Sequence, residues 1–173
     1  MELNGSRTIA ADRATVWAAL NDPDVLRACI PGCSELTGSP DEGFEATVTQ
    51  KVGPVKATFK GAVTLSDIVE GESYTISGEG KGGAAGFAKG GARVSLADVE
   101  GGTELSYVVD AKVGGKLAQL GSRLIDGFAK KMADQFFERF QTAVEGPSAA
   151  EAAADAGATP EEKKKSWLGK LMG

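Results

Sequence analysis

The 173-residue sequence contains no histidine and only two cysteines. Histidine is the most frequent general base in enzymes, so its absence removes the commonest acid–base catalyst. A structural zinc site needs about four ligands, and Cys29 and Cys33 supply only two soft donors, so we expect no metal site. The same two residues cannot form a disulfide framework, and we expect free thiols. Their CxxxC spacing, with Pro31 inside it, leaves one redox pair as the open alternative.

The chain also lacks long apolar runs and an excess of positive charge. No apolar stretch approaches the ~20 residues that a membrane-spanning helix needs. Residues 1–11 are polar and alternating, unlike a signal peptide, so we expect a cytoplasmic protein. The net charge of -5 argues against nucleic acid as the general partner. A chain of this length with 42% apolar residues is sufficient for one domain with its own core.

The most periodic stretch of the sequence runs from Gly115 to Val144. Its large apolar side chains recur every three or four residues, and its charged side chains fall mostly on the other side. This pattern predicts a long amphipathic helix near the end of the chain, whose apolar stripe needs a surface of matching length. The stripe consists of Leu117, Leu120, Leu124, Ile125, Phe128, Met132, Phe136 and Phe140.

The residues before this helix predict one strand, two short helices and then a sheet. Glu2 to Ala10 alternates as a strand does, and Asp12 is placed to cap the first short helix. The second short helix starts at Asp22 or Asp24, with a proline tolerated in its first turn.

From Glu35 onward, apolar and polar residues alternate in short segments separated by turns that contain glycine. Each segment therefore has one buried and one solvated face, which is typical of an antiparallel sheet. A curved antiparallel sheet wrapped around a long C-terminal helix, with two short helices after the first strand, is the α+β arrangement called helix-grip. A strongly curved sheet and a straight helix cannot touch along their whole length, so we expect a hydrophobic cavity between them.

Strand alternation and the helical stripe select the residues that we expect to line this cavity. The set is apolar except for Gln50 and Tyr107, which either hydrogen-bond a carbonyl or hydroxyl of the ligand or are satisfied polar groups at a sheet end. No acid, base or nucleophile is predicted to point inward, so the sequence favours a binding protein without catalytic residues. The predicted lining comprises Trp17, Leu20, Phe44, Val48, Gln50, Phe59, Phe87, Tyr107, Leu120, Leu124, Phe128 and Met132.

The glycine-rich segment Gly78–Gly91 formally contains the GxGxxG pattern of dinucleotide-binding proteins. That function is excluded, because the pattern requires a following helix, and strands flank this segment instead. Two interpretations remain. The segment is either a flexible hairpin or a mobile lip over the cavity with Phe87 as its plug, since glycine and alanine leave room above a sheet.

The composition changes after residue 145. We expect residues 1–145 to form the domain and residues 146–160, rich in alanine, glycine and proline, to form a linker. Residues 161–173 fit a basic amphipathic segment that contacts an anionic membrane weakly and reversibly. A solvated tail and a docking peptide for a protein partner are the alternatives. The expected membrane-contacting residues are Lys163, Lys164, Lys165, Trp167, Leu168, Lys170, Leu171 and Met172.

Five short motifs together resemble the carbon monoxide dehydrogenase CoxG family, and the similarity extends over about residues 1–145. The motifs are VWAALNDP at 16–23, CIPGC at 29–33, KVGPV at 51–55, GGAAGFAKG at 82–90 and VGGKLAQ at 113–119.

This resemblance implies membership of the START-like, or SRPBCC, superfamily of helix-grip proteins with a hydrophobic cavity. It also implies an accessory protein of molybdenum-containing carbon monoxide dehydrogenases and related hydroxylases, rather than a catalytic component. Such proteins are associated with bringing the dehydrogenase to the cytoplasmic membrane and with binding quinone.

The sequence therefore favours a quinone-binding peripheral adaptor at the inner face of the cytoplasmic membrane, with menaquinone or ubiquinone as its ligand. The alternatives are a recruitment module without a ligand, another START-like lipid-binding protein, and an enzyme of the cyclase or hydrolase kind.

Overall fold

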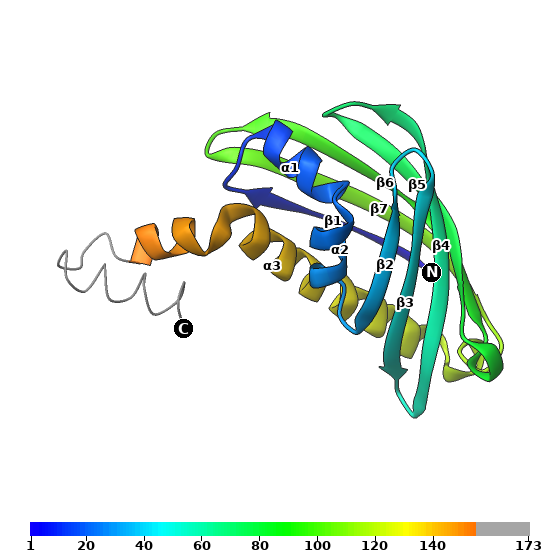
Figure 1. Ribbon diagram of the computed structural model, residues 1–173. Coiled ribbons are helices and arrows are strands. Elements are labelled where there is room, and N and C mark those ends of the chain that lie inside the picture. The colour runs from blue at the N-terminus through cyan, green and yellow to red at the C-terminus, as the bar shows by residue number, and fades with distance from the viewer. Residues whose placement is uncertain (155–173) are drawn as a thin grey trace.

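The computed structural model describes residues 1–154, with side chains described as far as residue 145. A strongly curved sheet wraps around one long helix, α3, which lies along its concave face (Figure 1). The helices are α1 (Arg13–Leu20), α2 (Pro23–Cys29) and α3 (Ser122–Ala154), with short 3-10 turns η1 (Gly83–Ala85) and η2 (Ala118–Leu120). The strands are β1 (Glu2–Ile9), β2 (Cys33–Ser39), β3 (Gly43–Val52), β4 (Val55–Val69), β5 (Ser73–Lys81), β6 (Phe87–Val99) and β7 (Gly102–Gly114).

All seven strands form one antiparallel sheet in the order β1-β7-β6-β5-β4-β3-β2. Consecutive strands are neighbours except that β1 pairs with β7, so β1 and β2 form the two edges. The short helices α1 and α2 connect these edges, and α2 packs against both β2 and α3 (Figure 1). The predicted α+β helix-grip arrangement is confirmed.

Each of the two short helices begins at an aspartate. The carboxylate of Asp12 accepts a hydrogen bond of 2.8 Å from the backbone N–H of Thr15, and hydrogen bonding from the side chain and then the backbone of Thr15 lowers the pKa of Asp12. The carboxylate of Asp22 accepts one of 2.9 Å from the N–H of Asp24, and Pro23 occupies the first turn of α2. The predicted cap at Asp12 is confirmed, and Asp22 is the residue that starts the second helix.

The long helix begins later than its apolar pattern predicts. Residues 115–121 form a turn and the 3-10 turn η2 rather than the first turns of α3. Gly115 and Gly121 have φ angles of 72° and 90°, in the left-handed region that favours glycine. These two glycines therefore redirect the chain from β7 into α3, and the predicted helical start at Gly115 is wrong.

Two apolar clusters hold α3 against the sheet. The larger one surrounds Phe140, which is fully buried together with Ile9, Val16 and Leu105. The smaller one, around Val52, Leu117 and Ile125, lies where α3 begins. The clusters hold α3 near Ile125 and near Phe140, and an unfilled space remains under the helix between these two positions.

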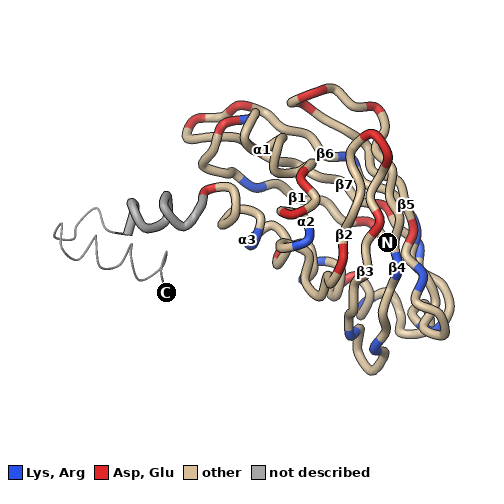
Figure 2. Tube along the Cα trace, in the orientation of Figure 1, with Lys and Arg blue, Asp and Glu red and all other residues tan. Residues whose placement is uncertain are grey.

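Most lysines lie toward one end of the sheet and the acidic residues of several turns lie toward the other, although Glu79 pairs with Lys81 among the lysines (Figure 2). We call the end with the β3–β4 and β5–β6 turns the lysine end and the end with the β4–β5 and β6–β7 turns the acidic end. At the acidic end Arg13 pairs with Glu72 and Asp98, at 4.0 and 3.4 Å. The lysine end carries Lys51, Lys56, Lys60, Lys81, Lys89, Lys112 and Lys116, and the acidic end carries Asp41, Glu42, Asp67, Glu70, Glu72, Asp98, Glu100 and Glu104.

Of the predicted linker, residues 146–154 continue the backbone of α3. Residues 155–160 and the predicted membrane-contacting tail lie outside the described residues. Within the part of the chain that the structure describes, no helix is both long and apolar enough to cross a membrane.

Candidate functional site

The concave face of the sheet encloses an apolar cavity of about 340 Å³ under α3 and α2. Strands β2 to β7 supply its floor, the end of α1 and the residues of α2 supply one wall, and α3 supplies another. Its lining consists of Leu20, Leu26, Ile30, Leu36, Phe44, Ala46, Gly61, Val63, Leu65, Tyr74, Ile76, Ala92, Val94, Tyr107, Val109, Ala133, Phe136 and Phe137.

An open trough of about 350 Å³ continues the cavity toward the lysine end of the sheet. Ala46, Gly61, Val63, Ile76, Ala92 and Val109 line both spaces, so the two are contiguous. The floor of the trough is made largely of glycine and alanine, whose small side chains leave space above the strands. Its additional small residues are Gly78, Gly80, Ala88, Gly90, Gly91 and Ala111.

The polar side-chain groups among the residues that line the cavity are the hydroxyls of Tyr74 and Tyr107. Tyr74 is 4% exposed, and burial raises its pKa, so the phenol stays protonated. The Tyr107 ring stacks on Phe137, with centroids 4.7 Å apart and an angle of 19° between the planes. Such a space suits a flat or elongated apolar ligand with very few polar atoms.

Five predicted site residues lie along this cavity and trough. Leu20, Phe44 and Tyr107 line the cavity, whereas Val48 and Phe59 line the trough. The strand alternation therefore identified the concave face correctly.

Trp17 lies one layer behind the cavity wall. Its ring meets that of Tyr74 edge to face, with centroids 5.3 Å apart and an angle of 83°. Trp17 therefore does not line the cavity as predicted. It supports Tyr74, which does.

Gln50 and Phe87 do not reach the ligand space. The amide of Gln50 donates a hydrogen bond to the backbone carbonyl of Pro31, so it is a satisfied polar group that fastens β3 to the end of α2. Phe87 is 39% exposed, and it pairs with Gly114 on the outer face of the sheet, where a β-carbon on Gly114 would meet its ring. The predicted plug is therefore wrong.

The four residues near or on α3 that were predicted to line the cavity do not line it, and residues further along the helix do. Leu120 and Phe128 pack against the smaller apolar cluster, Leu124 is 40% exposed beside Gly53, and Met132 is half-buried but lines neither space. The helix residues that line the cavity are instead Ala133, Phe136 and Phe137. The later start of α3 and the small cluster around Ile125 account for this shift.

The glycine-rich hairpin is part of the sheet. Strands β5 and β6 pair without a register shift up to Lys81 and Phe87. The connecting turn is fastened by a hydrogen bond of 3.0 Å from the N–H of Leu117 to the carbonyl of Ala85, which is buried. The turn at the tip of this hairpin therefore packs against the start of η2. That the segment moves as a lip over the cavity stays a prediction.

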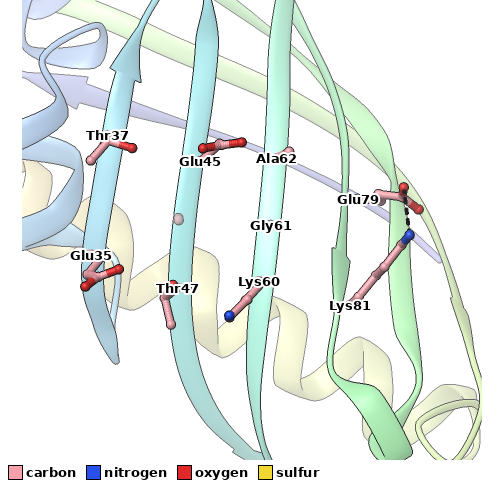
Figure 3. A pocket seen from close by; sticks show the side chains of 10 residues that line it. Glu35, Thr37, Glu45, Thr47, Lys60, Gly61, Ala62, Glu79 and Lys81 are labelled. Carbon is pink, nitrogen blue, oxygen red and sulfur yellow. Dashed lines mark ion pairs between the residues drawn. The ribbon is translucent and has the colours of Figure 1, made fainter.

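A second hollow, of about 450 Å³, lies on the outer face of strands β2 to β5 (Figure 3). Its lining is largely charged and hydroxyl side chains, including Glu45, Thr47 and Lys60, and Lys81 pairs with Glu79 at 3.8 Å. These groups stand on the solvated side of the same strands whose alternate residues face the cavity. We interpret this hollow as an ordinary solvated sheet surface.

Both cysteines are free in the structure. Burial raises the pKa of both thiols, and Cys29 is only 1% exposed, so it behaves as a core residue. Among residues 1–154, no group of three or more histidine, cysteine, aspartate or glutamate side chains is placed to hold a metal ion.

Comparison with known families gives one match, over residues 5–145, to the carbon monoxide dehydrogenase CoxG family. The matched region contains every described residue of the cavity and the trough. No curated protein matches the chain.

Solved structures share the fold over nearly their whole length. A conserved protein from Geobacillus kaustophilus is 30% identical, with a TM-score of 0.77 over 83% of this chain and 95% of that one. A protein from Chromobacterium violaceum is 17% identical, with a TM-score of 0.62 over 84% and 97% of the two chains. A protein from Mycobacterium smegmatis is 16% identical, with a TM-score of 0.60 over 82% and 89%. The last two resemblances concern the fold alone.

Proposed function

The chain belongs to the carbon monoxide dehydrogenase CoxG family, and from this premise we propose that it binds a respiratory quinone, menaquinone or ubiquinone, in its cavity. We further propose that it couples a molybdenum-containing carbon monoxide dehydrogenase, or a related hydroxylase, to the inner face of the cytoplasmic membrane. Family membership supports the accessory role. The quinone and the membrane are proposals that rest on the residues of this chain.

The observation that carries the quinone proposal is the shape and chemistry of the cavity. A half-enclosed apolar chamber lies next to a more open trough floored by small residues. A quinone has the matching form, since it combines a flat ring with an extended isoprenoid chain. The volumes of the two spaces lie at the lower end of the range of about 300–1,000 Å³ found for small-molecule sites.

Quinone binding would serve electron transfer from the dehydrogenase to the membrane. A dehydrogenase that is not embedded in the bilayer must deliver its electrons to a quinone that is confined there. A protein that lifts the quinone partly out of the lipid, or presents it, would shorten that gap. The apolar lining with two phenols supports binding, whereas a cyclase or hydrolase would need acidic or basic groups facing the ligand.

Membrane contact is proposed for two surfaces. One is the basic tail segment, whose lysines and apolar residues fit an anionic lipid surface, although its structure lies outside the described residues. The other is the lysine end of the sheet, where the exposed side chains of Phe87 and Leu124 accompany the lysines. Lysines near an anionic bilayer each contribute on the order of 1 kcal/mol.

The quinone proposal is tested by extracting protein purified from its native host and identifying the bound lipid by mass spectrometry. We expect menaquinone or ubiquinone in the extract, and we expect added quinone to refill protein that has been stripped of lipid. A cavity that is empty after purification and also refuses both quinones would instead support a recruitment adaptor without a ligand.

The tail is tested in the full-length chain by replacing Lys163, Lys164 and Lys165 with glutamate. Vesicles containing phosphatidylglycerol should bind this variant at least tenfold more weakly than the unaltered protein, because favourable charge contacts become repulsive. Sedimentation with the vesicles measures the binding, and phosphatidylcholine vesicles provide the neutral control. Equal binding of the two proteins to anionic vesicles would contradict membrane contact by the tail.

A further inference from the structure

Tyr74 is the most deeply buried polar residue of the cavity. It lies on the concave face of β5, 4% exposed, and its ring is supported by Trp17 of α1. Leu20 of α1 and Leu26 and Ile30 at α2 line the same cavity, and Tyr74 lines this cavity but not the trough. Tyr74 therefore stands at the covered end of the ligand space, away from the open trough.

The hydroxyl of Tyr74 forms no hydrogen bond with any protein group in the part of the chain whose side chains are described. A buried hydroxyl without a partner destabilises the protein, and phenylalanine would fill the same space without that cost. A water molecule needs two to four polar partners, and the lining around Tyr74 is hydrocarbon. The natural partner of this hydroxyl is therefore an oxygen that arrives with the ligand.

The second phenol of the cavity is directed elsewhere. The hydroxyl of Tyr107 lies over Gly5 of the edge strand β1, where an added β-carbon would come within 2.5 Å of it. Strand β6 separates β7 from β5, so the two tyrosines stand two strands apart, about 10 Å at their backbones. Tyr107 thus offers the cavity its stacked ring, and Tyr74 offers the hydroxyl.

We propose that the Tyr74 hydroxyl donates a hydrogen bond to a carbonyl oxygen of the quinone and so fixes the direction in which the ligand lies. The ring then occupies the covered end beneath α1 and α2, and the isoprenoid chain runs along the trough toward the lysine end. This inference rests on the proposed quinone binding. Because burial raises the pKa of Tyr74, the phenol remains a donor throughout the neutral range.

A substitution in the trough tests the position of the ligand's isoprenoid chain independently of Tyr74. A β-carbon on Gly80 would meet its neighbours only at 3.9 Å or more, so a side chain can be added there without displacing the backbone. Gly78 is unsuitable, because a β-carbon there would collide with the carbonyl oxygen of Ala62. Gly80→Leu should therefore block the trough and leave the covered end unchanged.

The first experiment measures the affinity of the full-length protein for 2-methyl-1,4-naphthoquinone, which has the ring and both carbonyls but no isoprenoid chain. Tyr74→Phe should weaken this binding about tenfold, the loss expected for one hydrogen bond in a buried site. It should not change the affinity for 2-methylnaphthalene, which has no carbonyl. Equal effects on the two compounds, or no effect on either, would overturn the inference.

A thermal melt of the ligand-free protein separates a binding role from a structural one. Since the hydroxyl has no partner among the described side chains when the ligand is absent, Tyr74→Phe should melt at the same temperature as the unaltered protein or higher. A lower melting temperature would show that the hydroxyl is satisfied within the protein, and the inference would fail.

The second experiment uses Gly80→Leu with Ala62→Leu as its control, because Ala62 is exposed on the outer face of the neighbouring strand. Gly80→Leu should weaken binding of a long-chain menaquinone at least tenfold and leave 2-methyl-1,4-naphthoquinone unaffected, whereas Ala62→Leu should alter neither. If Gly80→Leu also lost its affinity for 2-methyl-1,4-naphthoquinone, the proposed direction of the ligand in the cavity would be contradicted. If the unaltered protein bound neither quinone, the proposed function would fail together with this inference; if it bound both and the Tyr74→Phe result were negative, only the inference would fail.

Discussion

Replacing Phe140 with alanine will lower the free energy of unfolding by about 3–5 kcal/mol, the range measured for truncating a fully buried phenylalanine. Phe140 is 0% exposed in the larger apolar cluster, and its ring stacks on that of Phe136 with centroids 5.9 Å apart. The contacts join α3 to β1, β7 and α1, so the cavity left behind would loosen the attachment of the helix. Surrounding side chains belong to three different elements and cannot all move into the gap.

Denaturant or thermal unfolding measures this loss, which corresponds to a melting temperature about 10 °C lower for a domain of this size. Val108→Ala is a suitable control, because Val108 is 59% exposed on the outer face of β7 and its truncation should change stability by less than about 0.5 kcal/mol. Equal destabilisation by the two substitutions would mean that α3 is not held by the Phe140 cluster.

Replacing Ala133 with phenylalanine should abolish high-affinity ligand binding without unfolding the protein. Ala133 lines the cavity from α3, and a ring at this position would occupy the space that we assign to the ligand. If ~100 Å² of ligand surface can no longer be buried, about 2.5 kcal/mol of binding energy is lost, which lowers the affinity by nearly two orders of magnitude. The new ring enters existing empty space, so the usual cost of overpacking should be small.

The matched control is Ala143→Phe on the same helix, because Ala143 is exposed and borders a hydrophilic hollow with Gln135 and Arg139. Titration with quinone, alongside a thermal melt of each variant, separates lost binding from lost stability. Retention of normal affinity by Ala133→Phe would show that the ligand site lies elsewhere.

The sheet and its inward face were predictable because alternation leaves little choice. Once Phe44, Ala46 and Val48 are assigned to one side of β3, the side on which each remaining residue of that strand lies is fixed. Tyr74 was not among the predicted lining residues, although the same alternation extends to β5, because nothing in the sequence distinguished its hydroxyl from that of any other tyrosine in a sheet. Only the arrangement of its neighbours shows that this group is buried and has no partner within residues 1–145.

The start of α3 could not be located from periodicity alone. A 3-10 turn has three residues per turn, so Leu117 and Leu120 keep an apolar spacing that also fits an α-helix. The continuous helical pattern also led to the interpretation of Gly121 and Gly127 as glycines inside a helix that mark a close neighbour. Gly121 adopts a positive φ at a chain reversal, and a β-carbon on Gly121 or Gly127 would meet nothing within 4 Å, so no close neighbour explains either residue.

The direction of Phe87 could not be predicted because its surroundings carry no pattern. Glycine and alanine on both sides of it give no alternation between buried and solvated positions, and a shift of one residue moves a side chain to the opposite face. The pairing of Phe87 with Gly114 decides the matter in favour of the outer face.

The separation of charge along the sheet gives the molecule a permanent electric dipole. Near a negatively charged surface, the field of that surface exerts a torque on this dipole, which turns the lysine end toward the surface and the acidic end, with α1, away from it. The trough opens at the lysine end, so the torque would align its mouth with the surface before any contact forms. Because counterions screen such forces beyond about 10 Å at 0.1 M salt, the alignment acts only over the last approach and weakens as the ionic strength rises.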